Sequence, residues 1–165
     1  IWDSQVIPEC ESKAADITEV LNKAGGDLTS LGEEFDGVKT ASATYYNYSV
    51  KAEGATITAV DKDSFYGTIT LSVPGYEGDT VITCQIGQYK NSSIRDDMSF
   101  INFADFTNQT EWNQINTSML QKVDETVVQP VYDQLTEGAT VDLVGCFTAD
   151  SAKEMVITPV VLTVQ

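Results

Sequence analysis

Apolar residues in the first 44 positions recur at three- and four-residue spacing, the period of a helix that packs one face on a core. Asp16 and Glu19 have the spacing of an N-terminal capping box, and Gly25 follows as a stop signal. The pattern therefore predicts a helix over 16–24 and a second, shorter helix over 28–36. The apolar face of the first helix comprises Ala14, Ile17, Val20, Leu21 and Ala24.

From residue 45 the period of the apolar positions changes to two, which predicts β-strands. The first strand covers 45–59, and its apolar positions change parity at Gly54. One extra residue in a β-bulge produces such a change, and a bulged strand can bend to serve both halves of a small barrel. Four further strands are predicted over 65–73, 81–86, 139–148 and 155–164.

A helix is predicted between the third and fourth strands, with Thr110 as its cap and Pro130 at its kink or end. Three strands, a helix and two strands, with a bulge in the first strand, are the order of the OB-fold. We therefore predict a mainly β (α+β) fold, a five-stranded OB-like Greek-key barrel. Residues 1–44 form a helical extension packed on the barrel, and residues 45–165 form the barrel domain.

The charge of the chain limits the classes of partner. Its 165 residues include 25 acidic and 9 basic side chains, a net charge of -16, with 42% hydrophobic residues. Nucleic acids and anionic membrane surfaces are bound chiefly through Lys and Arg, so both are disfavoured. The composition is that of a soluble, acidic globular domain.

Several chemistries are excluded or unsupported. The chain has no histidine, which rules out triads built on one, and no glycine-rich phosphate-binding motif occurs. Asp61 and Asp63 alternate like the start of a calcium loop, but the glycine and glutamate that complete such a loop are missing, which favours a turn. We predict no catalytic residue, no metal and no cofactor. A hydrolase built on two carboxylates stays open, because the sequence does not tell which acids face each other across a cleft.

The single arginine, Arg95, is the main candidate for a binding residue, because its planar fork of donors suits carboxylates and sugar hydroxyls. In one interpretation it holds a ligand, with nearby acid and amide side chains adding directional hydrogen bonds. In the other, which we favour, it pairs inside the protein and fixes its own loop. The candidate ligand- or partner-binding residues are Arg95, Asp96, Asn102, Asn108, Gln109 and Gln85.

Two further residue sets are assigned to packing. Cys10, Cys84 and Cys146 are odd in number and lack metal-like or redox-like spacing, which favours free thiols over a disulfide or a zinc site. Phe100, Phe103 and Phe106 could stack on a sugar or a base, but the apolar residues around them favour core packing.

Short motifs spread along the chain carry a resemblance to a known family. They are Ile1-Trp2-Asp3-Ser4, Ala14-Ala15-Asp16, Gln85-Ile86-Gly87, Ile94-Arg95-Asp96, Phe100-Ile101-Asn102-Phe103, Asp105-Phe106-Thr107-Asn108-Gln109 and Ile157-Thr158-Pro159-Val160. Together they resemble a family of predicted bacterial periplasmic lipoproteins of unknown function, over nearly the whole chain. The chain departs from the pattern at residues 90–93, which replace a glycine-rich approach to Arg95, and at the additional acid Asp97.

The resemblance implies an OB-like barrel and a lipid anchor upstream of this sequence. It also implies a location in the bacterial cell envelope, on the periplasmic side or the outer surface, and an association with transport systems for simple sugars. It implies no catalytic residues. Our first hypothesis is an extracytoplasmic, non-enzymatic binding or interaction module, accessory to a sugar transport system, whose partner is an envelope protein or transporter component. The alternatives are an oligonucleotide-binding OB domain and a carboxylate-based glycan hydrolase.

Overall fold

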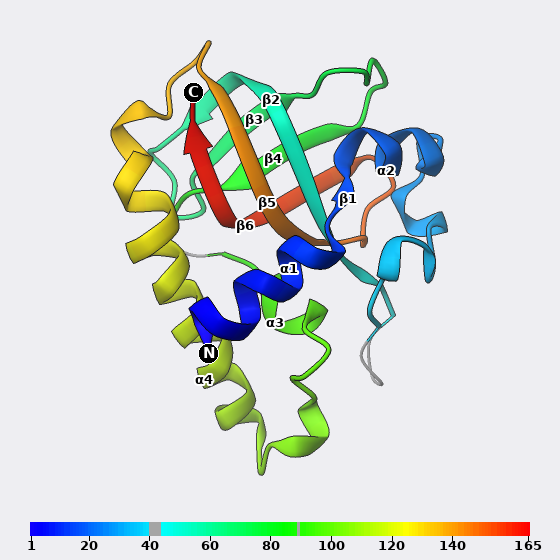
Figure 1. The fold of residues 1–165 in the computed structure, drawn as a ribbon, viewed down its shortest axis with the longest axis vertical. Helices are drawn as coiled ribbons and strands as arrows, with labels where there is room; N and C mark the ends of the chain where they lie inside the picture. The colour runs from blue at the N-terminus through cyan, green and yellow to red at the C-terminus, as the bar shows by residue number, and fades with distance from the viewer. Residues whose placement is uncertain (40–43, 89) are drawn as a thin grey trace.

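The computed structural model describes residues 1–39, 44–88 and 90–165. In these residues, five strands close into one barrel (Figure 1) in the order β2-β3-β4-β6-β5, with β5 pairing back onto β2. The pairs are antiparallel except β4 with β6, which is parallel. The strands are β2 (Asn47–Asp61), β3 (Thr68–Ser72), β4 (Val81–Gln85), β5 (Thr140–Thr148) and β6 (Glu154–Val164). The predicted OB-like barrel is confirmed.

Closure depends on a bend in the long strand β2. Its first half pairs with β5, as Val50 does with Gly145, and its second half pairs with β3, as Ile57 does with Leu71. The register with β5 shifts between Ala52 and Ala55. Gly54 lies inside this bulge with φ of +69°, and its N–H donates to Asp142 at 2.7 Å. The bulge predicted from the parity change is therefore present.

The N-terminal extension contains one helix that the pattern predicted and one that it missed. Helix α2 (Ile17–Ala24) begins at Asp16, which accepts hydrogen bonds from the backbone N–H groups of Thr18 and Glu19, and ends at Gly25 in the left-handed conformation. The missed segment is a π-helical turn, η1 (Trp2–Val6), that runs into α1 (Ile7–Lys13). Strand β1 (Ala15–Asp16) then pairs in parallel with β2.

The second predicted helix is wrong in type. Residues 28–36 form two short 3-10 turns, η2 (Leu28–Ser30), capped by Asp27, and η3 (Glu34–Asp36). Residues 40–43, which fall inside the predicted extension 1–44, lie outside the described residues.

The connection from β4 to β5 carries the barrel's helices. They are α3 (Ser93–Asp97), η4 (Phe103–Asp105), α4 (Gln109–Lys122), η5 (Val123–Val128) and η6 (Gln129–Gln134). Asn108, rather than Thr110, caps α4, and Pro130 lies in the first turn of η6, where the helix tightens. None of the described helices is both long enough and apolar enough to cross a bilayer.

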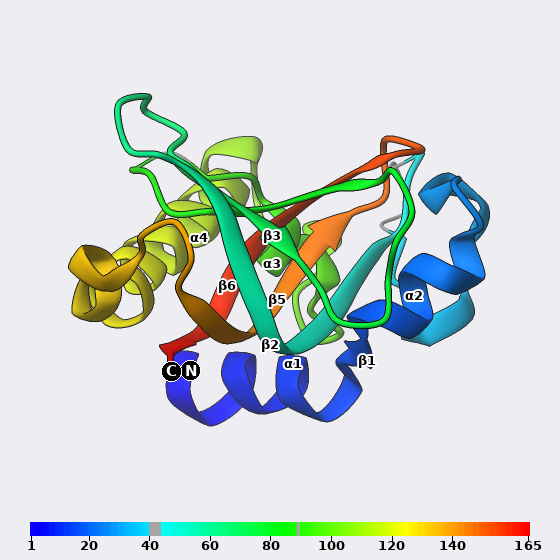
Figure 2. The same cartoon turned by 90° about the horizontal axis from the view of Figure 1, so that it is seen from above.

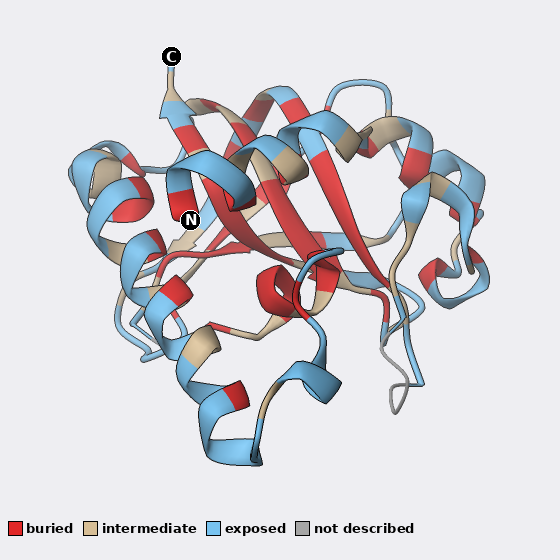
Figure 3. Cartoon of the chain, turned by 60° about the horizontal axis from the view of Figure 1, so that its bottom comes forward, coloured by how far each residue is buried: buried red, intermediate tan, exposed pale blue. Residues whose placement is uncertain are grey.

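The core fills the barrel and continues beneath the helices. Figure 2 shows α1 running along one side of the barrel below β2, and α1 contacts β2, β5 and β6. Buried residues mark the strands and the inner faces of the helices (Figure 3). Val6 and Cys10 of the N-terminal segment are fully buried, as are Ile94 of α3 and Val123 of η5. The extension is therefore part of the same hydrophobic core as the barrel.

The loop between β2 and β3, residues 62–67, is held at both ends. Asp61 accepts hydrogen bonds from the N–H groups of Asp63 and Ser64, which is the predicted turn. At its far end the Gly67 carbonyl accepts from the Ile86 N–H at 3.0 Å. The predicted strand over 65–73 therefore begins too early, because β3 starts at Thr68 and leaves Phe65 in the loop.

Gly87 permits the close approach of this loop to the end of β4. A Cβ there would lie 2.5 Å from the Tyr66 carbonyl carbon and 2.6 Å from the Gly67 nitrogen, both backbone atoms. We expect Gly87→Ala to lower the free energy of unfolding by about 2 kcal/mol, because overpacking must move backbone rather than a side chain. Urea denaturation measures the change, with Gln88→Ala as the neighbouring control. Equal midpoints for the two variants would contradict this account.

Candidate functional site

The guanidinium of Arg95, on α3, contacts other groups of the chain through its face and through two of its nitrogens. Its guanidinium lies 4.2 Å from the centre of the Trp112 ring, and its Nε donates to Asp96 Oδ1 at 2.9 Å. One terminal nitrogen donates to the Trp112 carbonyl oxygen at 3.3 Å. Only 8% of the residue is exposed. Arg95 therefore ties α3 to α4 through a cation–π contact and a hydrogen bond.

Asp96 completes this arrangement, since its second carboxylate oxygen accepts from Ser92 Oγ at 2.7 Å. Arg95 and Asp96 thus bind each other and neighbouring groups of the same chain. The geometry matches a loop clasp, with little of the guanidinium left for a ligand.

The other predicted binding residues lie in separate surroundings. Gln85 is buried, and its side-chain oxygen accepts from the Asn91 N–H at 2.8 Å and from Thr158 Oγ1 at 3.2 Å. Asn108 caps α4 by accepting from the Glu111 N–H. Gln109 donates to Asn113 one turn along the helix, and Asn102 is exposed. The structure brings Arg95 and Asp96 together, whereas Gln85, Asn108 and Gln109 bind other groups of the chain.

Two of the three phenylalanines of this segment are more exposed than predicted, whereas Phe106 is partly buried and packs against the core. Phe103 is 45% exposed and Phe100 is 37% exposed, so their assignment to the core is wrong. Phe103 and Phe106 instead pack edge-on against Trp112, at 5.5 and 5.3 Å between ring centres. Trp112 supplies the apolar surface on which both rings and Arg95 rest.

Sequence reasoning missed a buried ion pair between α1 and α3. Lys13 Nζ lies 3.2 Å from Asp97 Oδ1 and 3.2 Å from Glu9 Oε2, and it also donates to the Asp97 backbone carbonyl. Ser49 of β2 donates to Asp97 Oδ2 at 2.5 Å. Because 84 residues separate Lys13 from Asp97, no local pattern could have paired them.

Burial sets the protonation of this cluster. Asp97 is fully buried, and its desolvation raises its pKa to about 6, although Lys13 and the hydrogen bond from Ser49 act in the opposite direction. For Lys13, burial opposes the charge, but the carboxylates of Asp97 and Glu9 outweigh it and raise the pKa. The cluster fastens α1 to the barrel at the cost of keeping a carboxylate away from water.

The cysteines occupy two separate places. Cys84 is buried on β4, whereas the sulfurs of Cys10 on α1 and Cys146 on β5 lie 3.5 Å apart. Cys146 Sγ is also 3.6 Å from Asp97 Oδ2. The structure draws no bond between these sulfurs. No local pattern indicates the contact between Cys10 and Cys146, which lie 136 positions apart in the sequence.

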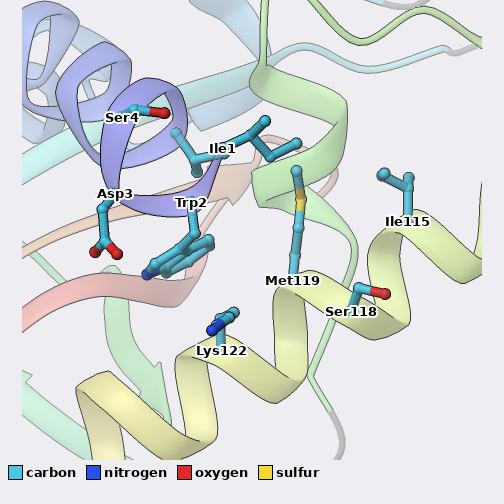
Figure 4. A pocket seen from close by; sticks show the side chains of 9 residues that line it. Ile1, Trp2, Asp3, Ser4, Ile115, Ser118, Met119 and Lys122 are labelled. Carbon is cyan, nitrogen blue, oxygen red and sulfur yellow. The ribbon is translucent and has the colours of Figure 1, made fainter.

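An apolar recess of about 450 Å³ lies between the N-terminal turn and α4. Figure 4 shows Met119 extending from α4 toward Ile1, with Trp2 beside them. The Trp2 indole N–H has no hydrogen-bond partner among the described residues. These walls suit packing against apolar groups and offer little for chemistry.

A smaller, more polar recess of about 240 Å³ lies where the β2–β3 loop meets the helical connection. It is lined from the loop by Lys62 and Phe65, and from the connection by Asp124 and Tyr132, among others. Lys62 Nζ donates to the Tyr132 carbonyl at 2.9 Å and lies 4.4 Å from the centre of its ring. The loop projects at the upper left in Figure 2.

This loop exposes two adjacent aromatic side chains, Phe65 at 66% and Tyr66 at 64%. In OB-folds, the loop between the first two strands is one of those that bind ligands. The alternating pattern had placed Phe65 inside a strand, so this feature was not foreseen.

Comparison with known proteins assigns the chain to a family. The family model described as "Predicted periplasmic lipoprotein (DUF2291)" matches residues 1–163. This chain belongs to that family. The predicted resemblance and the extracytoplasmic, periplasmic placement of the family are thereby confirmed. The comparison with curated proteins finds no match.

The fold of this DUF2291 member is also seen in a solved structure. A crystal structure of an OB-fold protein from Thermotoga maritima matches with a TM-score of 0.72 and 20% sequence identity. The match covers 92% of this chain and 86% of that chain. It supports the barrel topology and includes most of the N-terminal extension.

Replacing Arg95 tests its role as a clasp. We expect Arg95→Ala to lower the free energy of unfolding by about 3 kcal/mol, because it removes a buried charge-assisted hydrogen bond and the contact with Trp112. Arg95→Lys should recover only part of this loss, since an ammonium lacks the planar fork. Chemical denaturation of both variants gives the values. Wild-type stability in Arg95→Ala would exclude the clasp.

The raised pKa of Asp97 predicts a pH-dependent contribution to stability. Because the folded pKa of about 6 lies above the unfolded value, this group stabilises the fold at low pH and loses that contribution as pH rises through about 6. Between pH 7 and pH 5 the wild type should gain about 1 kcal/mol that Asp97→Asn lacks. Denaturation at both pH values measures the difference. Asp63→Asn, at an exposed acid, is the control and should follow the wild type; an identical pH response in Asp97→Asn would refute the assignment.

Proposed function

We propose that this periplasmic lipoprotein is a binding module without catalytic activity, which recognises a protein component of an envelope transport system for simple sugars. The exposed pair Phe65 and Tyr66, beside the polar recess at the β2–β3 loop, is the observation that carries the proposal. Exposed aromatic side chains of this size commonly become the buried anchors of protein interfaces.

The setting of the pair favours a defined binding surface. Gly87 holds the loop against the end of β4, and Lys62 is fastened to Tyr132, so the aromatic side chains start from an anchored backbone. Less conformational entropy is lost when a binding loop is already ordered. The recess beside the loop adds amide and hydroxyl groups that can accept or donate hydrogen bonds, including Gln88, Gln129 and Ser64.

Charge favours a protein partner over an oligonucleotide. The chain carries -16 overall, and Lys62, which lines the recess with Phe65, already donates to a backbone carbonyl. Binding of a nucleic acid relies on free cations along its phosphates. An aromatic surface within an acidic protein instead suits a neutral or basic protein surface.

A carboxylate-based hydrolase finds little support at this recess. Asp124 is the one carboxylate among the described residues that line it, whereas glycoside hydrolysis generally uses two acids across the scissile bond. The buried Asp97 binds Lys13 and Ser49 beneath α1. The link to sugar transport rests on the resemblance, because lipoproteins of this kind often accompany transport systems for simple sugars.

Capture of the lipid-anchored protein from its native envelope tests the proposal. We expect a transporter component or a solute-binding protein to be recovered with the wild type. The double variant Phe65→Ala, Tyr66→Ala should reduce that recovery at least tenfold, because it removes the aromatic anchors. Quantitative mass spectrometry of the captured material provides the measurement.

Phe100→Ala is the matched control, because it removes an exposed aromatic side chain from another segment. It should leave recovery unchanged. Equal recovery with the double variant, or salt-sensitive binding of single-stranded DNA by the purified protein, would count against the proposal.

A further inference from the structure

We propose that Cys10 and Cys146 are joined by a disulfide in the protein as it exists in the periplasm, while Cys84 remains a thiol. The two sulfurs already lie 3.5 Å apart, in contact, one on α1 and the other on β5. A covalent bond requires their approach to about 2.05 Å. Cys146 lies on a strand that pairs with both β2 and β6, so α1 is the element that moves to close the gap.

The three cysteines lie in different surroundings. Both thiols are fully buried, and Cys146 is also 3.5 Å from the hydroxyl of Ser49. Cys84 belongs to β4, where it pairs in register with Ile69 and Ile157 inside the barrel. The chain therefore offers one preorganised pair and one isolated thiol among its three cysteines.

The compartment supplies the chemistry. The family is periplasmic, and the periplasm is an oxidising compartment in which thiol–disulfide oxidoreductases introduce disulfides. A thiolate of the pair attacks the oxidant's disulfide and forms a mixed disulfide, and the second thiolate then displaces the oxidant. Two electrons and two protons pass to the oxidant, whose disulfide becomes two thiols, and one S–S bond forms between Cys10 and Cys146.

Burial determines when this exchange can take place. In the folded protein, desolvation raises the pKa of the Cys146 thiol well above its ordinary value, and neither sulfur is exposed. Exchange needs an accessible thiolate. Oxidation therefore precedes the docking of α1 on the barrel, and docking then shields the finished bond from reductants.

The bond would reinforce the contact that holds the N-terminal segment. Lys13 and Asp97 join α1 to α3 close to the same place, and Cys146 lies 3.6 Å from Asp97. A cross-link between residues 136 positions apart restricts the unfolded chain over most of its length. The segment that carries the chain's N-terminal end would thus be fixed to the barrel by a covalent bond as well as by an ion pair.

Thiol counting tests the pairing directly. The full chain is exported to the periplasm of a host with a disulfide-forming system, denatured without reductant and alkylated, and its labels are counted by mass spectrometry. We expect one label per chain, on Cys84, and three after prior reduction. Cys84→Ser should take no label without reductant, and Cys10→Ser should take two. Three labels on the unreduced wild type, or a peptide linking Cys84 to another cysteine, would overturn the proposal.

A stability measurement adds evidence that does not depend on labelling. Reduction before thermal unfolding should lower the Tm of the wild type and of Cys84→Ser by roughly 10 °C, because the released loop is long. Cys10→Ser should show no response to reductant. An unchanged Tm of the wild type after complete reduction would contradict the cross-link as a stabilising bond.

Discussion

The bend of β2 at Gly54 is the constraint on which the rest of the structure depends. Without it, one strand could not pair with β5 along its first half and with β3 along its second. The bulge places Gly54 at positive φ, where a residue with a side chain would be strained. Asp142 of the neighbouring strand accepts a hydrogen bond from the Gly54 N–H. Closure of the sheet removes its edges and leaves the helices to cover the ends and one side of the barrel.

Two of the nine cations of this acidic chain attach those helices. Arg95 joins α3 to α4 through Trp112, and Lys13 joins α1 to α3 through Asp97. Each places a charge where little water reaches it, so each needs its partner.

Local patterns in the sequence predicted the features that depend on neighbouring residues, such as strands, bulges and helix ends. Alternation located the strands, the parity change located the bulge, and Asp16 with Gly25 bounded α2. Trp2, Val6 and Cys10 recur at four-residue spacing and are all buried. This spacing is typical of a helix and indicates the N-terminal helical segment. Phe65 continues the alternating pattern of β3 but lies in the loop before that strand. The Gly67 carbonyl accepts a hydrogen bond from the Ile86 N–H, and the chain turns there before β3 begins.

The candidate site was less accessible to prediction, because its decisive contacts join distant residues. The sequence singles out Arg95 as a ligand-binding residue or a loop clasp, but its stacking on Trp112 depends on how α4 returns along the barrel. The contact of Cys10 with Cys146 depends on where α1 docks. Hydrophobic periodicity indicates which residues face the core. It does not indicate that Phe65 is exposed in a loop.

We propose that recognition occurs at the β2–β3 loop and not at the Arg95 segment. Photo-crosslinking in the native envelope, from a photoreactive residue at position 65 or at the exposed position 102, compares the two directly. The account predicts a discrete adduct with an envelope protein from position 65 and none from position 102. A protein adduct from position 102 alone would contradict it.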